Sequence, residues 1–159
     1  MRPRRWRGYT LVELLVVMAI MGILAAMLMP LAEVTVQREK ERELKRALWE
    51  IRDAIDGYRR VRDCGGVGGG QAVTLYPPDL MALTAPVQDA RPDHRGEVHR
   101  FLRRVPRDPF ADPSLPADRS WGLRSYLSEA DQPKAGNDVY DVYSLAAGVG
   151  LNGVPLRQW

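Results

Sequence analysis

Residues 7–30 of the chain are RGYTLVELLVVMAIMGILAAMLMP, a short basic leader that ends in Gly8 and is followed by an apolar run. Residues 14–29 carry no charge, and Glu13 is a lone carboxylate near the start of the run. Residues 9–32 are long enough to cross a bilayer, which takes roughly 20 mostly apolar residues. Because a charge at membrane depth is costly, Glu13 is a candidate functional residue.

Length and composition indicate one folded domain beside this apolar segment. The chain has 159 residues, 45% of them hydrophobic and 27% charged, which argues against uniform disorder. Its net charge is +3, but four of the 23 Lys and Arg residues precede Gly8. If the chain is cut after Gly8, the remaining 19 bases face 20 acids and the net charge is −1, so nucleic-acid binding is not expected. The single cysteine, Cys64, excludes an intrachain disulfide and a cysteine-built zinc site.

The arginines of residues 1–8 predict the orientation of the chain in a membrane. Positive charge before a first span favours the cytoplasmic side, so we expect the bulk of the chain to be exported. Three interpretations compete: a secretory signal peptide cut after the apolar run, an uncleaved anchor, and a leader cut before the run. The first lacks an Ala-x-Ala cleavage site between residues 18 and 32 and would carry Glu13 in its apolar core.

The third interpretation matches a known family. Residues 8–17, with Glu13 among them, resemble the class III leader of type IV pilins and type II secretion pseudopilins. The resemblance implies that prepilin peptidase cleaves after Gly8 and methylates the new N-terminus on Tyr9. The family usually has Phe at this first mature position, so Tyr9 is a departure, whereas Glu13 at the fifth mature position agrees. Pro30 matches the family proline near which the helix loosens in filaments, which implies a part in assembly.

Charge pairing suggests what Glu13 does in assembly. Cleavage after Gly8 would expose a cationic amine on Tyr9, close to the depth of Glu13 but poorly placed to pair with it in the same helix. Between axially staggered subunits, the carboxylate of one can meet the amine of the next, and buried charges are tolerable only when paired. The alternative interpretation places Glu13 at the interfacial edge of the bilayer.

Residues 33–63 continue the helix with a different character. They contain no proline and only Gly57 as a weak helix breaker. Apolar residues recur at spacings of three and four, which predicts an amphipathic helix; they are Leu44, Leu48, Ile51, Ile55 and Tyr58. We interpret the charges of residues 38–46 as a solvated face, with exposed pairs such as Glu41 and Lys45.

Residues 64–159 predict a small domain with short elements. The glycine-rich residues 64–70 end the helix, and a short helix is expected next, with either Asp79 as its cap or Pro78 in its first turn. Residues 86–96 are expected to form a loop, and residues 98–105 one or two helical turns. Strands are predicted at 121–128 and 139–145, joined as an antiparallel hairpin, with a third short strand near 154–158.

The second half resembles the G-type major pseudopilin of type II secretion. The matching segments are residues 76–83, 101–110 and 141–145, together with Trp159. Members of this family often bind calcium in a C-terminal loop, but residues 149–159 contain no acid. Calcium prefers six to eight oxygen ligands, several of them carboxylate, so the expected state is a loop without metal. The weak calcium candidates are Asp138, Asp141, Ser144 and Asn152.

No catalytic arrangement is recognisable in the sequence. The two histidines, His94 and His99, match no zinc-protease spacing and lie in polar sequence expected to be exposed. A basic cluster at residues 100–107 is interpreted as a solvated face, with a subunit or DNA contact as the alternative. We therefore expect a structural protein and no enzyme.

The sequence thus predicts an α+β, pilin-like fold: a long N-terminal helix packed on a small antiparallel sheet. Its parts are a cleaved leader (1–8), a transmembrane and filament-core helix (9–32), its amphipathic continuation (33–63) and a periplasmic domain (64–159). The resemblance implies a bacterial inner-membrane, single-pass subunit of a type II secretion pseudopilus. Its partners would be copies of itself, prepilin peptidase, minor pseudopilins and the inner-membrane assembly platform. The alternatives are a type IV pilin and a membrane-anchored periplasmic binding protein that does not polymerise.

Overall fold

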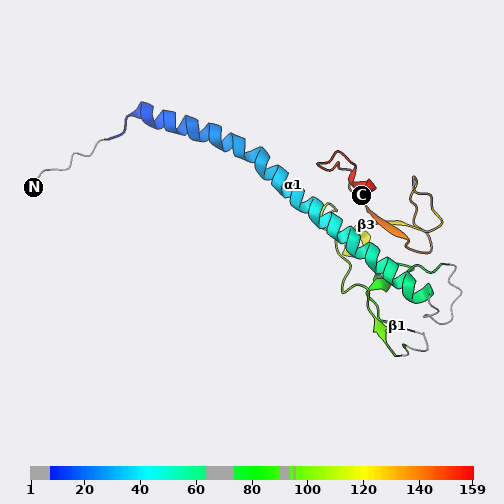
Figure 1. The fold of residues 1–159 in the computed structure, drawn as a ribbon. Coiled ribbons are helices and arrows are strands. Elements are labelled where there is room, and N and C mark those ends of the chain that lie inside the picture. Colours follow the sequence, from blue (N-terminus) through cyan, green and yellow to red (C-terminus); the bar gives the residue numbers. More distant parts are fainter. Residues whose placement is uncertain (1–7, 64–73, 90–93, 95) are drawn as a thin grey trace, which may run out of the picture. The chain divides into compact units, whose positions relative to one another are not determined.

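The computed structural model of the chain describes residues 8–63, 74–89, 94 and 96–159 (Figure 1). The side chains of residues 27–32 and 63 are also outside the described part. The chain divides into two compact units, Met1–Glu39 and Lys40–Trp159. The predicted glycine-rich loop with Cys64, and the leader up to residue 7, lie outside the described residues.

The long helix α1 spans Leu11–Asp63 and confirms the predicted helix. It starts at Leu11 because Thr10 caps it: the Thr10 Oγ1 accepts a hydrogen bond from the Glu13 N–H, at 3.2 Å. Pro30 lies within α1.

Among the described residues, no helix combines the length and the apolar character that crossing a membrane requires.

The second half of α1 carries the core of the unit Lys40–Trp159. The predicted apolar stripe from Leu44 to Tyr58 is buried, as the spacing predicted. It packs in one cluster with buried residues from later parts of the chain, which are Tyr76, Leu80, Leu83, Leu102, Val105, Trp121, Val139, Val142 and Leu156. Glu41 contradicts the prediction of a wholly solvated charged face, because it is 9% exposed. Its Oε1 accepts a hydrogen bond from the Leu151 N–H.

Two small antiparallel sheets follow the helix. Strand β3 (Trp121–Arg124) pairs with β4 (Asp141–Ser144), with Trp121 opposite Ser144, so the predicted hairpin is confirmed with shorter strands. Strand β1 (Val87–Gln88) pairs with β2 (Val98–His99), with Val87 opposite His99. Figure 1 shows β1 and β3 beside the second half of α1. The α+β, pilin-like fold class is therefore confirmed.

Two local predictions were wrong. Residues 98–105 contain strand β2 instead of helical turns, because Val98 and His99 bond across to residues 87 and 88, which were expected to be loop. Residues 154–158 do not form a strand. Leu156–Gln158 is the 3₁₀ helix η4, and only an isolated bridge joins Val149 to Pro155. Pro155, with its fixed φ and no N–H, cannot extend a ladder.

Short 3₁₀ helices complete the unit. The helix η1 (Met81–Leu83) confirms the short helix predicted after Asp79, whose Oδ1 accepts a hydrogen bond from the Ala82 N–H at 2.7 Å. The helix η3 (Ala117–Arg119) precedes β3 directly. The predicted site residues lie at the start of α1, at Pro30 within it, and in residues 138–152.

Candidate functional site

The first candidate region is the start of α1. Gly8, Tyr9 and Thr10 are outside regular secondary structure, and the helix follows at once. Glu13 is exposed in the first turn, where a carboxylate interacts favourably with the helix dipole. Thr10 was missed as a cap, although Thr10-x-x-Glu13 has the spacing of a capping box. The structure therefore gives Glu13 a local role as well, since its N–H closes the cap.

The apolar run around Glu13 is exposed on all sides. The large apolar side chains from Tyr9 to Leu24 are between 47% and 76% exposed, with no polar face among residues 14–26. A helix that is apolar all round is stable only when buried, in lipid or against other helices. This described stretch is therefore a surface that needs a partner.

The four weak calcium candidates are each engaged in a different interaction. The Asp141 Oδ1 pairs with the Arg52 Nε at 2.8 Å. The Ser144 hydroxyl donates to the Asp108 Oδ2 at 2.6 Å, and the Asn152 Oδ1 accepts from the Val154 N–H. The Asp138 Oδ1 accepts from the Ser125 hydroxyl and the Tyr126 N–H. Each of the four residues therefore has a bonding partner within the fold, and the calcium site stays a prediction.

Asp138 is the most unusual of the four because it is a buried acid. Burial by itself would raise its pKa, but hydrogen bonds from Ser125, Thr74 and the Tyr126 N–H outweigh burial and hold the pKa of Asp138 below its ordinary value. Its Oδ1 takes the bonds from Ser125 and Tyr126, and its Oδ2 is buried without a hydrogen bond of standard geometry. The carboxylate is thus charged at neutral pH and anchors the turn before β4.

The C-terminal segment, residues 141–159, is attached to α1 by side chains that the sequence did not single out. Arg52 donates from its Nε to Asp141, and from its Nη2 to the Val142 and Trp159 carbonyl oxygens. The Lys45 Nζ lies 4.4 Å from the centre of the Trp159 ring. With the Glu41 bond to Leu151, these contacts fix residues 141–159 against the helix. In the sequence, Arg52 and Lys45 look like ordinary surface charges, so no local signal could have found them.

Asp108 is a second buried acid that sequence reasoning did not identify. It is 0% exposed, its Oδ1 accepts from the Phe110 N–H at 2.8 Å, and its Oδ2 accepts from the Ser144 hydroxyl. In the sequence it lies between Pro106 and Pro109, with no pattern that indicates burial. The bond to Ser144 joins this turn to β4 and explains why an acid is needed there.

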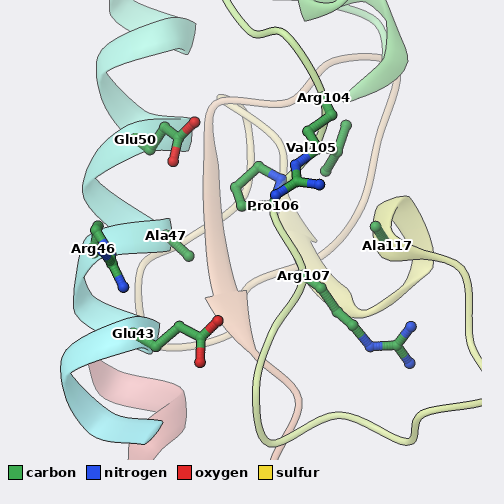
Figure 2. A pocket seen from close by; sticks show the side chains of 9 residues that line it. All are labelled: Glu43, Arg46, Ala47, Glu50, Arg104, Val105, Pro106, Arg107 and Ala117. Atoms are coloured by element: carbon green, nitrogen blue, oxygen red, sulfur yellow. The ribbon is translucent and has the colours of Figure 1, made fainter. Parts of the chain in front are cut away.

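A cavity of about 600 Å³ lies between α1 and the segment around Pro106 (Figure 2). Glu43 and Glu50 line it from the helix, and Arg104 and Arg107 belong to the opposite wall. Figure 2 shows the Arg107 side chain pointing away from α1, and its Nη2 donates a hydrogen bond to the Asp112 carbonyl oxygen. Arg104 is exposed, so the interpretation of the basic cluster as a solvated face stays a prediction. The lining holds no serine, cysteine or histidine that could act as a nucleophile or a general base.

Comparisons with known proteins match both the N-terminal motif and most of the chain. Residues 4–29 match the family model of the prokaryotic N-terminal methylation motif. The chain is 27% identical over 116 residues to type II secretion system core protein G of Aeromonas hydrophila, a match that covers 71% of this chain and 73% of the relative. No solved structure is significantly similar to the chain.

The long N-terminal helix, with the methylation motif at its start and small antiparallel sheets beside its second half, gives this chain a pilin-like fold. Within that class, the motif and the similarity to core protein G support the type II secretion pseudopilin family.

Proposed function

We propose that the chain is a structural subunit of a type II secretion pseudopilus, a helical filament of many copies that drives protein export across the outer membrane. The observation that carries the proposal is the helix surface of residues 11–26, which is exposed and apolar on all sides and carries a single acid. Residues 27–32, whose side chains are outside the described part, complete this apolar run in the sequence. Before assembly the run would lie in the inner membrane, and afterwards sister helices would cover it.

Glu13 and the cleavage site supply the assembly step of this proposal. Prepilin peptidase would cut after Gly8 and methylate Tyr9, and the new amine would pair with Glu13 of a neighbouring subunit. Gly8 and Tyr9 lie outside regular secondary structure and Glu13 is exposed, which is compatible with both events. The unit Lys40–Trp159, which has its own core, would form the filament surface in the periplasm. Minor pseudopilins and the inner-membrane assembly platform are the further partners that the similarity to core protein G suggests.

N-terminal mass analysis of the membrane-extracted protein tests the processing. We expect a chain that begins at methylated Tyr9. A chain that begins at Met1, or after Ala32, would overturn the proposed cut and the assembly step that depends on it.

Substitution of Glu13 tests the assembly step. We expect Glu13→Ala to leave insertion intact and to abolish filaments in electron micrographs, because the neighbour's amine loses its partner. Glu33→Ala removes an exposed acid from the same helix and should leave filaments normal. Cross-linking through an added Leu15→Cys substitution should yield a ladder of multimers in the otherwise wild-type protein and in Glu33→Ala, but not in Glu13→Ala. Normal filaments from Glu13→Ala would refute the pairing, and the absence of any ladder would favour a non-polymerising anchor.

A further inference from the structure

The β1–β2 hairpin brings three potential metal ligands to one face. Val87 lies opposite His99, and the Asp89 N–H bonds to the Glu97 carbonyl oxygen at 2.9 Å, so Asp89 and Glu97 are the next facing pair. Side chains two residues apart on a strand project from the same face, and those of facing residues are neighbours. Asp89, Glu97 and His99 therefore share one face because of the register.

The distances between these side chains suit one small metal ion. The His99 Nε2 lies 3.1 Å from the Asp89 Oδ2 and 3.9 Å from the Glu97 Oε2, and one ligand atom from each residue lies within 4.8 Å of the others. Tetrahedral bonds of about 2.0–2.2 Å place ligand atoms roughly 3.3–3.6 Å apart. The observed separations fall on both sides of that value and require only small side-chain adjustments.

The charges and donor types indicate which class of metal would bind. Asp89 is 3% exposed, whereas the side chains of His99 and Glu97 are 31% and 57% exposed, so two carboxylates and an imidazole meet at the boundary between the core and solvent. We propose that Asp89, Glu97 and His99 form a site for a borderline divalent transition metal of the Zn²⁺ class, with water completing the coordination. One imidazole and only two carboxylates suit Zn²⁺ better than Ca²⁺, which takes six to eight oxygens. A divalent ion would neutralise both acids.

Neighbouring residues hold the ligands in position. The His94 Nδ1 lies 3.1 Å from the Glu97 Oε2, so His94 supports Glu97 from outside the three ligands. The His99 ring stacks on Phe101 at 6.3 Å between ring centres, and Phe101 in turn meets Tyr58 of α1 at 5.6 Å. A bound ion would therefore join the two strands of a hairpin with only two residues in each and fix it against the helix.

Metal titration of the full chain tests this site. The protein is purified in detergent without a polyhistidine tag, stripped with a chelator and titrated calorimetrically with Zn²⁺, with Ca²⁺ and Mg²⁺ for comparison. We expect one Zn²⁺ per chain and much weaker binding of the other two ions. Asp89→Asn and His99→Gln should each weaken Zn²⁺ binding by more than about 100-fold, and His94→Gln by about 10-fold, as for an outer partner. Asp118→Asn, in η3, is the control and should not alter binding.

A spectroscopic readout keeps the test decisive if a variant fails to fold. Co²⁺ bound to the wild-type chain should show the intense visible absorption of a four-coordinate site, and Zn²⁺ should displace it. Circular dichroism of each variant in chelator separates a lost ligand from a lost fold. No saturable binding, no four-coordinate spectrum, or wild-type affinity in a folded His99→Gln would overturn the proposal. In those cases the Asp89–His99 contact is a hydrogen bond only.

Discussion

Arg52 gives the sharpest test of how the C-terminal segment is held. Its guanidinium donates three hydrogen bonds, to the Asp141 carboxylate and to the Val142 and Trp159 carbonyl oxygens. Arg52→Met keeps much of the apolar stem and removes every donor. Each bond contributes about 1 kcal/mol net. The side chains of Arg52 and Asp141 are 35% and 29% exposed, so solvent screening moderates the ion pair. We therefore expect the free energy of unfolding to fall by about 2–3 kcal/mol.

The assay is thermal unfolding of the full chain in mild detergent, followed by near-ultraviolet circular dichroism. For a unit of this size, each kcal/mol corresponds to about 4 °C, so the midpoint should fall by about 10 °C. Arg52→Lys retains the charge but not the planar fork of donors and should recover less than half of the loss. Arg60→Met is the matched control, because the Arg60 side chain is 73% exposed and its ion pair with Asp53 is long, at 4.0 Å. Equal midpoints for Arg52→Met and Arg60→Met would refute the role of Arg52.

Two further predictions concern the buried acids. Asp108→Ala should lower the free energy of unfolding by about 3 kcal/mol because it leaves the Phe110 N–H and the Ser144 hydroxyl unpaired. The test is a double-mutant cycle with Ser144→Ala, measured by thermal unfolding. Purely additive losses of stability would contradict the contact between Asp108 and Ser144. The depressed pKa of Asp138 means that its contribution is fully present above the ordinary Asp pKa, about 4, and is lost as pH falls through the lower folded value. Unfolding midpoints measured from pH 6 to pH 3 should therefore fall more steeply for the wild type than for Asp138→Asn, and parallel curves would argue against this assignment.

The features predicted correctly from the sequence depend on short-range patterns. The stripe from Leu44 to Tyr58 has a helical period, and the β3–β4 hairpin combines aromatic and β-branched residues with a turn-rich connection. Each pattern is visible in one continuous stretch of the sequence, so it could be recognised without knowing the fold. The N-terminal motif was equally local, and the family comparison matched the same residues.

The features that the sequence did not predict depend on distant partners. Glu41 looked like part of a solvated face because its partner, the Leu151 N–H, lies 110 positions away. His99 belongs to a strand only because residues 87 and 88 pair with it, and its nearness to Asp89 follows from that register. Four potential calcium ligands could be proposed from the family resemblance, but their separate bonding partners depend on the tertiary structure. Burial of Asp108 between two prolines has no sequence signature at all.

The Thr10 cap also sets a boundary in the backbone. Because α1 begins at Leu11, the peptide bond between Gly8 and Tyr9 is outside the helical hydrogen-bond ladder. A peptidase that cleaves this bond would need to unwind no turn of helix to reach it. The same hydroxyl that closes the first turn would remain on the mature side of the cut, three residues before Glu13. A single threonine would thus allow the chain to be cut without disturbing the helix that assembly requires.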